Sequence, residues 1–310
     1  MAKRIFIDGE AGTTGLEIRA RLEGRAGIEL LAIDAARRKD ADARKRLLNE
    51  ADGVVLCLPD DAAVDAVSLI ENGAVKVVDA SSAHRTDKGW VFGFAEMVPG
   101  QAERIAEATR VSNPGCYPTG FIGLVRPLVD AGLLPAETPL TVNAVSGYSG
   151  GGRKMIEAYE RKDNPDYVDS PHRVYGLGLE HKHTDEMRVH GGLTHRPLFV
   201  PSVGRFRAGM IVQVPLQLWA LPGRPAPADL HDALSDAYAG KPFVTVMPLA
   251  PDGEGTRQLD AEGLNGSNRL DLHVFANAAR GQAVLAAVLD NLGKGAAGQA
   301  VQNLNLMLGL

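Results

Sequence analysis

The first 115 residues alternate short apolar runs with helical stretches, and this alternation constrains the fold more than any other feature. Amphipathic stretches, among them 16–24, 43–51 and 62–73, separate apolar runs at 4–7, 28–33, 54–59, 75–80 and 110–113. Strands joined by helical connections of about 10–15 residues require crossovers, and crossovers give a parallel sheet. The pattern predicts an α/β, Rossmann-like first domain.

The pattern changes after about residue 138. Long alternating runs occupy 140–147, 199–204, 209–219, 243–249 and 269–277, with fewer helical stretches between them. They predict a second, α+β domain built on an antiparallel or mixed sheet. The segments 281–292 and 298–308 have helical periodicity, and a C-terminal helix is expected to return to the first domain. The predicted domains are 1–115 with 282–310, and 116–281; a chain of 310 residues is long enough for two.

Composition limits the classes of partner. Hydrophobic residues make up 45% and charged residues 23%, as in soluble globular proteins, and the net charge of −5 supplies no basic field for nucleic acid. No run approaches the roughly 20 apolar residues of a membrane span, and the N-terminal residues MAKRIFIDGE lack the apolar region of a signal peptide, so neither is expected. The two cysteines, far apart, form no disulfide framework and fit a reducing cytoplasm.

A glycine motif, DGEAGTTG, follows the first predicted strand and leads into a helix. Gly9, Gly12 and Gly15 would let the backbone approach a pyrophosphate, which the helix N-terminus would bind. The spacing is GxxGxxG rather than GxGxxG, so position in the fold carries the prediction of a dinucleotide site; a tight turn without a ligand is the alternative.

Basic residues follow the second predicted strand. Asp34 ends that strand, where an acid would bind a ribose, but Arg37 and Arg38 follow at once with Lys39. An arginine there accommodates a 2′-phosphate, so the cluster favours NADP(H) over NAD. Solvated charges at a helix start are the alternative.

The two cysteines lie in different contexts. Cys57 lies inside an apolar run and is interpreted as a core residue. Cys116 follows a Pro114-Gly115 turn and precedes the helical stretch FIGLVRPLV, so it is expected at a helix N-terminus, where the dipole favours a thiolate. It also follows the last predicted strand of the nucleotide domain, where ligands bind. Cys116 is therefore the candidate nucleophile, and a small apolar capping residue is the alternative.

A cysteine nucleophile needs an acid/base partner, and His181 and His183 in LEHKHTDEM are the candidates. Residues two apart on a helix face different ways, so one of the two is expected to face the site. A metal site with His190 and His195 is a rival interpretation that no cysteine or HExxH spacing supports, and no metal is expected.

Two polar loops could bind oxyanions. SGYSGGGRK, residues 146–154, combines serines, glycines and a guanidinium, and SSAHRTD, residues 81–87, follows the fourth predicted strand. Ordinary surface loops are the alternative for each. Substrate contacts are expected from Ser82, Arg85, Tyr148, Arg153 and Glu180.

Together these motifs resemble a known family. SNPGCYPTG, IDGEAGTTG, HKHTDEM, SGYSGGGRK and the tail KGAAGQAVQNLNLMLGL are similar to the shorter form of N-acetyl-γ-glutamyl-phosphate reductase, of the aspartate-semialdehyde dehydrogenase-like superfamily. The resemblance covers essentially the whole chain, and the cysteine nonapeptide and the tail are its most specific parts. It implies a Rossmann-like domain, a mixed-sheet domain and a C-terminal helix returning to the first.

The resemblance also implies a reaction: NADPH-dependent reduction of an acyl phosphate to N-acetylglutamate 5-semialdehyde, with release of phosphate, in arginine biosynthesis. Cys116 matches the family's nucleophile, and one of His181 and His183 its acid/base. The residues implied for the cofactor are Gly9, Gly12, Thr13, Thr14 and Gly15 for the pyrophosphate, and Ser146, Gly147 and Asn291 toward the nicotinamide. One departure is Ser202, which stands near a histidine position of longer members.

Two alternatives remain open at this point. One is a related acyl-phosphate or semialdehyde dehydrogenase, for example of aspartate semialdehyde. The other is a redox-sensing, nucleotide-binding regulator without enzymatic activity, in which Cys116 is the sensor. The lack of a second cysteine close by argues against the regulator. A small-molecule substrate, phosphate and a homo-oligomeric assembly are the expected partners.

Overall fold

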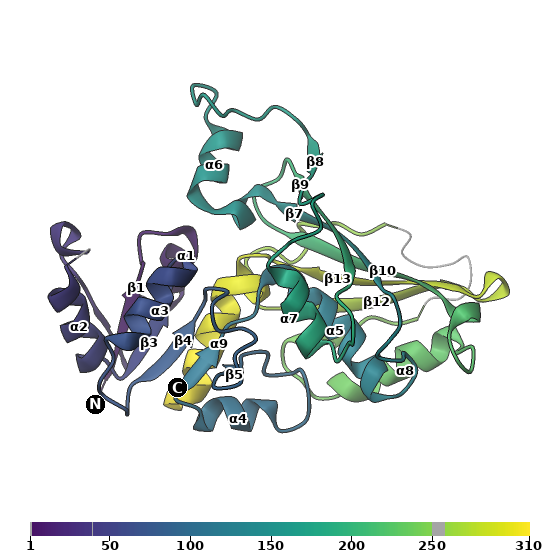
Figure 1. Cartoon of the computed structure of the whole chain (residues 1–310), viewed down its shortest axis with the longest axis horizontal. Coiled ribbons are helices and arrows are strands. Elements are labelled where there is room, and N and C mark those ends of the chain that lie inside the picture. The colour runs from purple at the N-terminus through teal and green to yellow at the C-terminus, as the bar shows by residue number, and fades with distance from the viewer. Residues whose placement is uncertain (1, 39, 250–257) are drawn as a thin grey trace. The chain divides into compact units, whose positions relative to one another are not determined.

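The computed structural model describes residues 2–38, 40–249 and 258–310, which divide into two compact units (Figure 1). The first unit comprises Met1–Ala95, Pro99–Gly115 and Ala296–Leu310. The second comprises Glu96–Val98 and Cys116–Gly295. Each unit has its own sheet.

The first unit contains an all-parallel sheet with strand order β2-β1-β3-β4-β6-β5 among the described residues. Its strands are β1 (Lys3–Asp8), β2 (Ile28–Leu31), β3 (Gly53–Leu56), β4 (Lys76–Asp79), β5 (Val91–Phe92) and β6 (Arg110–Ser112). The Rossmann-like α/β prediction is confirmed, because apolar runs such as GVVL, buried at every position, belong to strands covered on both faces.

Helices cover both faces of this sheet. They are α1 (Thr13–Leu22), α2 (Ala41–Glu50), α3 (Asp60–Ser68), α4 (Gln101–Glu107) and α9 (Gly298–Leu308). Side chains of α1, α4 and α9 pack with Ile5, Ile7 and Val55 in one cluster. Those of α2 and α3 pack with Phe6, Val54 and Leu56 in another. Since α9 belongs to the first cluster, the C-terminal helix does return to the first unit, as predicted.

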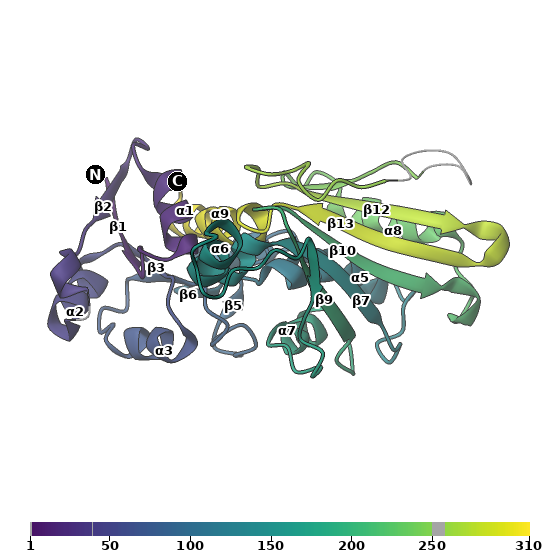
Figure 2. The same cartoon turned by 90° about the horizontal axis from the view of Figure 1, so that it is seen from above.

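The second unit contains a mixed sheet with order β11-β12-β13-β10-β7-β9-β8 among the described residues. Its strands are β7 (Thr141–Gly147), β8 (His172–Val174), β9 (Leu198–Gly204), β10 (Met210–Gln217), β11 (Val244–Val246), β12 (Leu270–Asn277) and β13 (Gln282–Leu289). The pairs β7–β9 and β11–β12 are parallel and the others antiparallel. The α+β prediction is confirmed, and Figure 2 shows β12, β13 and β10 side by side.

The helices of the second unit are α5 (Cys116–Asp130), α6 (Gly152–Glu160), α7 (His183–His190) and α8 (Pro227–Tyr238). α5 is apolar on most sides and packs against β10 and β13 and against α7 and α8. A close approach makes this possible: a Cβ on Gly120 would lie 2.9 Å from Cγ2 of Val212 in β10. α5 is therefore the helix around which the second unit is built.

The prediction of a helix at 281–292 is wrong. Residues Gln282–Leu289 form β13, which pairs along its full length with β10 on one side and β12 on the other. A strand buried between two neighbours needs apolar residues at nearly every position, and QAVLAAVL has the same apolar density as a buried helix. Residues 282–295 accordingly belong to the second unit, whereas the sequence assigns them to the first domain.

Candidate active site

Cys116 is the first residue of α5, directly after Pro114-Gly115. The first turn of α5 carries no acidic residue that would offset the partial positive charge of the helix N-terminus. That charge stabilises a thiolate. Cys116 is half-buried, so its sulfur lies near the positive end of the helix and remains partly accessible to a substrate.

Cys57 differs in each respect. It packs against the core cluster of the first unit, and burial, with the charges of Asp79 and Asp8, raises the pKa of its thiol to about 12. A thiol with that pKa carries almost no thiolate at neutral pH. Of the two cysteines, only Cys116 has the surroundings of a nucleophile.

Gly295 lies against Cys116. A Cβ on Gly295 would lie 2.8 Å from Cβ of Cys116 and 3.1 Å from the carbonyl oxygen of Asp290. The backbone N–H of Gly295 donates to that same carbonyl oxygen, at 3.0 Å. The segment therefore approaches the cysteine more closely than any larger residue would allow.

A buried ion pair holds the neighbouring residue. Lys294 is fully buried, and its Nζ lies 2.7 Å from Oε2 of Glu96, itself 2% exposed. The same ammonium lies 5.4 Å from the centroid of the Phe243 ring, over the ring face. Burial lowers the pKa of Lys294, and the Glu96 carboxylate opposes that shift. The pair fixes the segment whose next residue touches Cys116.

His181 and His183 both lie beside Tyr117, the residue after Cys116. Their ring centroids lie 6.2 Å and 5.9 Å from that of Tyr117, and 4.8 Å from each other. The Nδ1 atom of His181 accepts a hydrogen bond from the backbone N–H of His183, at 3.2 Å. Nδ1 is therefore unprotonated, and the proton of the neutral ring is on Nε2. Burial lowers the pKa of His181, with a smaller contribution from Lys182.

Two tyrosine hydroxyls meet next to the cysteine. Tyr175 donates to the hydroxyl of Tyr117 at 3.2 Å, and Tyr117 donates to the carbonyl oxygen of Ser202, also at 3.2 Å. Burial is the main cause that raises the pKa of Tyr117, and it raises that of Tyr175 to about 12. Both tyrosines are therefore neutral hydrogen-bonding groups at physiological pH.

The loop after β7 forms a second polar cluster. Asn291 donates to the hydroxyl of Ser149 at 3.0 Å and accepts from the N–H of Gly209 at 2.8 Å. The Ser146 hydroxyl donates to the carbonyl oxygen of Gly147 at 3.1 Å. A Cβ on Gly147 would lie 2.6 Å from the carbonyl oxygen of Arg207, so this position requires glycine. Three residues predicted to reach a nicotinamide thus lie in one network of the second unit.

The glycine loop of the first unit has the form of a phosphate-binding turn. Gly9 adopts φ +89°, and a Cβ there would lie 2.3 Å from the carbonyl oxygen of Cys57. The N–H groups of Thr13, Thr14 and Gly15 open α1 and have no hydrogen-bond partner among the described residues. Unsatisfied helix N-terminal amides bind anions, so the residues fit a dinucleotide pyrophosphate.

Two of the residues after β2 use their side chains in hydrogen bonds within this segment, and one arginine does not. Asp34 accepts from the N–H of Ala36 at 2.8 Å and caps a short 3₁₀ turn. Arg37 donates to Asp40 at 2.9 Å. Arg38 is exposed and has no side-chain partner among the described residues, whereas Lys39 lies outside them. Arg38 is therefore the cation in this cluster that is best able to meet a 2′-phosphate.

Ser82 and Arg85 follow β4 in the first unit and take part in its internal bonding. Ser82 donates to Asp60 at 2.7 Å. Arg85 is buried and donates from Nε to the carbonyl oxygen of Asn113 at 3.0 Å. Beside them, Nδ1 of His84 lies 2.6 Å from Oδ2 of Asp79. Arg85 thus supports the segment that leads into Cys116, and a substrate role for it stays a prediction.

The other candidates lie on half-buried or exposed parts of the second unit. Tyr148 donates to Glu160 at 3.1 Å. Arg153 forms an exposed ion pair with Glu157, and Glu180 one with Arg196. Their roles stay predictions. Ser202 donates to the carbonyl oxygen of Ala144 at 2.8 Å and so fastens β9 to β7.

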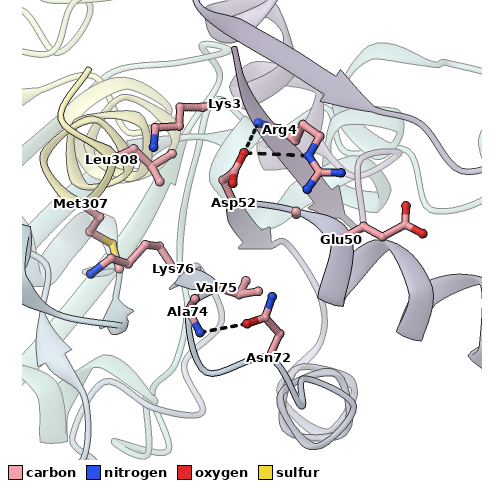
Figure 3. A pocket seen from close by; sticks show the side chains of 11 residues that line it. Lys3, Arg4, Glu50, Asp52, Asn72, Ala74, Val75, Lys76, Met307 and Leu308 are labelled. Atoms are coloured by element: carbon pink, nitrogen blue, oxygen red, sulfur yellow. Dashed lines mark hydrogen bonds and ion pairs between the residues drawn. The ribbon is translucent and has the colours of Figure 1, made fainter. Parts of the chain in front are cut away.

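A polar hollow of about 210 Å³ lies elsewhere in the first unit, at the amino ends of β1, β3 and β4 (Figure 3). Asp52 accepts from the backbone N–H of Arg4 at 2.7 Å, and Asn72 accepts from that of Ala74 at 3.1 Å. Nucleotides bind at the opposite, carboxyl ends of parallel strands, which is where the glycine loop lies. The hollow is therefore separate from the cofactor loop.

Sequence reasoning missed Tyr117, Tyr175, Glu96 and Lys294. Tyr117 stands next to the cysteine within the quoted nonapeptide, so proximity alone could have indicated it. Tyr175 and Glu96 carry no local signal, because their roles depend on partners far along the chain. Lys294 lies in a lysine–glycine segment typical of a surface loop.

The comparisons with known proteins agree with this geometry. The semialdehyde dehydrogenase NAD binding domain matches residues 4–107, and the semialdehyde dehydrogenase dimerisation domain matches residues 116–291. N-acetyl-gamma-glutamyl-phosphate reductase 2 of Nostoc sp. is 54% identical over 99% of this chain and 97% of its own length. N-acetyl-gamma-glutamyl-phosphate reductase of Brucella ovis is 54% identical over the full length of both chains.

Solved structures share the fold. Aspartate semialdehyde dehydrogenase II of Vibrio cholerae superimposes with a TM-score of 0.69 at 14% identity, covering 100% of this chain and 99% of that one. A probable aspartate-semialdehyde dehydrogenase of Pseudomonas aeruginosa gives 0.71 at 18% identity, covering 99% of each. The family matches and the full-length identity together show that the chain belongs to the N-acetyl-gamma-glutamyl-phosphate reductase family of semialdehyde dehydrogenase-like enzymes.

Proposed function

We propose that this chain reduces N-acetyl-L-glutamyl 5-phosphate to N-acetyl-L-glutamate 5-semialdehyde in arginine biosynthesis, with NADPH as reductant and Cys116 as nucleophile. Relatives that bear the reductase name at 54% identity over the whole chain support the reaction. The observation that carries the mechanism is the position of Cys116 at the start of α5, with two histidines grouped around the following tyrosine.

The first step is acyl transfer to sulfur. The Cys116 thiolate, stabilised by the α5 dipole, attacks the acyl-phosphate carbonyl, and inorganic phosphate leaves with the bonding electrons. The product is a thioester on Cys116. A thioester is a better hydride acceptor than a carboxylate, which is the chemical reason for covalent catalysis here.

The second step requires a proton donor at the developing oxyanion. Because Nδ1 of His181 accepts from the backbone, its Nε2–H is the available donor, and it can stabilise the negative charge on the thiohemiacetal oxygen. NADPH, when bound, supplies the hydride that converts the thioester to the thiohemiacetal. Collapse then expels the Cys116 thiolate and releases the aldehyde. His183 is the second candidate for the same task.

The cofactor would be held by the chain's own backbone and by one arginine. The amides of Thr13, Thr14 and Gly15 would bind the pyrophosphate, and Arg38 would pair with the 2′-phosphate that distinguishes NADP(H) from NAD. Ser146, Gly147 and Asn291 are proposed to contact the nicotinamide end. Exposed single ion pairs such as that of Arg153 are weak, so this arginine could exchange its partner for a substrate anion.

The test is the reverse reaction. Purified protein should reduce NADP only when both N-acetylglutamate 5-semialdehyde and phosphate, or arsenate, are present. Aspartate semialdehyde in the same assay is the matched alternative substrate, and greater activity with it would reassign the enzyme within the superfamily. Absence of turnover with any semialdehyde would favour the redox-regulator alternative.

The oligomeric state and the cellular location of the enzyme are also proposals. We expect a homo-oligomer, because the family that matches residues 116–291 is described as a dimerisation domain. None of the helices in the described parts of the chain is long and apolar enough to cross a membrane. Together with the biosynthetic reaction, this supports a cytoplasmic location.

A further inference from the structure

The second unit has a pocket that the reaction above does not assign, and we call it the α6–β8 pocket. It has a volume of about 390 Å³, within the range of small-molecule sites. It is lined by Gly151, Lys154, Met155, Ala158, Tyr159, Asp166, Val168, Arg173, Tyr175 and Val203. All of these residues belong to the second unit, as does Cys116.

Two cations line the pocket. Lys154 on α6 and Arg173 on β8 are exposed, and neither side chain has a hydrogen bond or ion pair to any described residue. Most of the other arginines in this unit are occupied by carboxylates; Arg153, Arg161 and Arg196 are examples. Two available cations on facing elements form an anion site, and a guanidinium matches a carboxylate with two parallel hydrogen bonds.

The rest of the lining combines apolar side chains with one carboxylate, and this combination limits the kinds of ligand that fit. Met155, Ala158, Val168 and Val203 form an apolar wall. Asp166 supplies one carboxylate, which can accept a hydrogen bond from an amide N–H. A ligand that fits carries a carboxylate, an N–H donor and a small apolar group within a few bonds.

Tyr175 joins the pocket to the nucleophile. It lines the pocket, and its hydroxyl donates to that of Tyr117, the residue after Cys116. Tyr175 also lies beside His181, with ring centroids 5.9 Å apart. A molecule that reacts at Cys116 would therefore have its far end directed toward Arg173 and Lys154.

We propose that the α6–β8 pocket binds the α-carboxylate and acetamido end of the substrate, with Arg173 and Lys154 pairing with the carboxylate and making the enzyme selective for it. The inference rests on the proposed function, whose substrate carries both groups two methylenes from the reacting carbonyl. The acetyl methyl packs on the wall at Met155 and Val168, and its amide N–H donates to Asp166. Arg173 and Lys154 act on substrate binding and leave the chemistry at Cys116 to other residues.

The experiment compares two aldehydes in the phosphate-dependent reduction of NADP. N-acetylglutamate 5-semialdehyde carries the carboxylate, and 4-acetamidobutanal is the same molecule without it. Arg173→Gln, Lys154→Gln and the double variant are measured beside wild type. Lys162→Gln is the control, because Lys162 is an exposed lysine of the same region that does not line the pocket.

For Arg173→Gln we expect kcat/KM for the carboxylate substrate to fall about 10- to 100-fold, mainly through KM, which is the loss expected for a charge-assisted hydrogen bond. The value for 4-acetamidobutanal should stay within about threefold of wild type in every variant. Arg173→Lys should recover part of the loss, since it restores the charge without the bidentate geometry. Lys162→Gln should match wild type on both aldehydes.

Three results would overturn the inference. One is unchanged kcat/KM for the carboxylate substrate in the double variant. Another is an equal loss on both aldehydes, which would mark a general effect on the fold or on the chemistry. The third is a wild type that does not prefer the carboxylate substrate over 4-acetamidobutanal. Failure of the proposed function looks different, because wild type would then turn over neither aldehyde in a phosphate-dependent way.

Discussion

Replacing Lys294 by methionine should destabilise the second unit strongly. Methionine fills much of the space of the lysine stem but leaves the Glu96 carboxylate, 2% exposed, without the ammonium 2.7 Å away. Removing one partner of a buried ion pair costs about 3–5 kcal/mol, or roughly two to four orders of magnitude in the unfolding equilibrium. The cost should shrink as the pH falls toward 5, because a buried carboxylate that has lost its cation escapes the cost of its charge by protonation.

The assay is urea unfolding at two pH values, with a double-mutant cycle. Glu96→Gln combined with Lys294→Met removes both charges and should recover at least half of the lost stability. Lys45→Met is the control, because Lys45 forms a comparable lysine–glutamate contact with Glu71 in an exposed position and should cost less than about 1 kcal/mol. The reasoning is refuted if Lys294→Met costs no more than Lys45→Met, or if the two changes at the buried pair add without coupling.

Four further outcomes are expected. Cys116→Ser should lower turnover by about 10⁴-fold or more while NADPH binding, followed by fluorescence, stays the same; retained turnover would exclude the thioester. His181 has a pKa below its usual 6.5, so its folded, neutral form loses stability relative to the unfolded chain as the pH falls below 6.5. A proton on Nδ1 of His181 would break the hydrogen bond from the N–H of His183 that orients the ring, so activity should decline over the same acidic range. An unchanged acid limb of the pH–activity profile in His181→Gln would assign the decline to another group. Arg38→Ala should raise KM for NADPH about 10-fold or more and leave KM for NADH unchanged, and an equal effect on both cofactors would contradict a 2′-phosphate contact. Gly295→Ala should crowd Cys116 with a methyl group and so slow alkylation of its thiol by iodoacetamide, and alkylation at the wild-type rate would show that the segment can move aside.

Periodicity was sufficient for the first unit and insufficient for one part of the second. The run 4–7 lies in β1 and the run 54–59 begins in β3, both of them parallel strands with covered faces, so apolar density, length and flanking glycines all indicated the same element. In 281–292 the apolar density was equally high, but whether it meant a helix or a strand depended on pairing with β10 and β12. No local pattern contains that information.

In the candidate site, too, some features follow from local sequence signals and others depend on contacts that only the structure shows. The helix start at Cys116 follows from a Pro-Gly turn and a periodic run, both local signals. The preference for His181 depends on one backbone hydrogen bond, which the spacing of two histidines could not reveal. The pairing of Arg37 with Asp40 also decides which arginine remains available, and only coordinates supply it.

The packing of α9 has a consequence for how the chain is made. Four residues of α9 complete the core on one face of β1, β3 and β4: Ala300, Val301, Leu304 and Met307. They follow the whole second unit in the chain and are therefore synthesised after it. Until they leave the ribosome, that face of the sheet has only α1 and α4 to cover it, while the whole second unit is already available to fold. The first unit is therefore completed only after the second has been synthesised, and a chain that stops before α9 would expose apolar sheet surface to chaperones and proteases while it keeps the candidate active-site side chains.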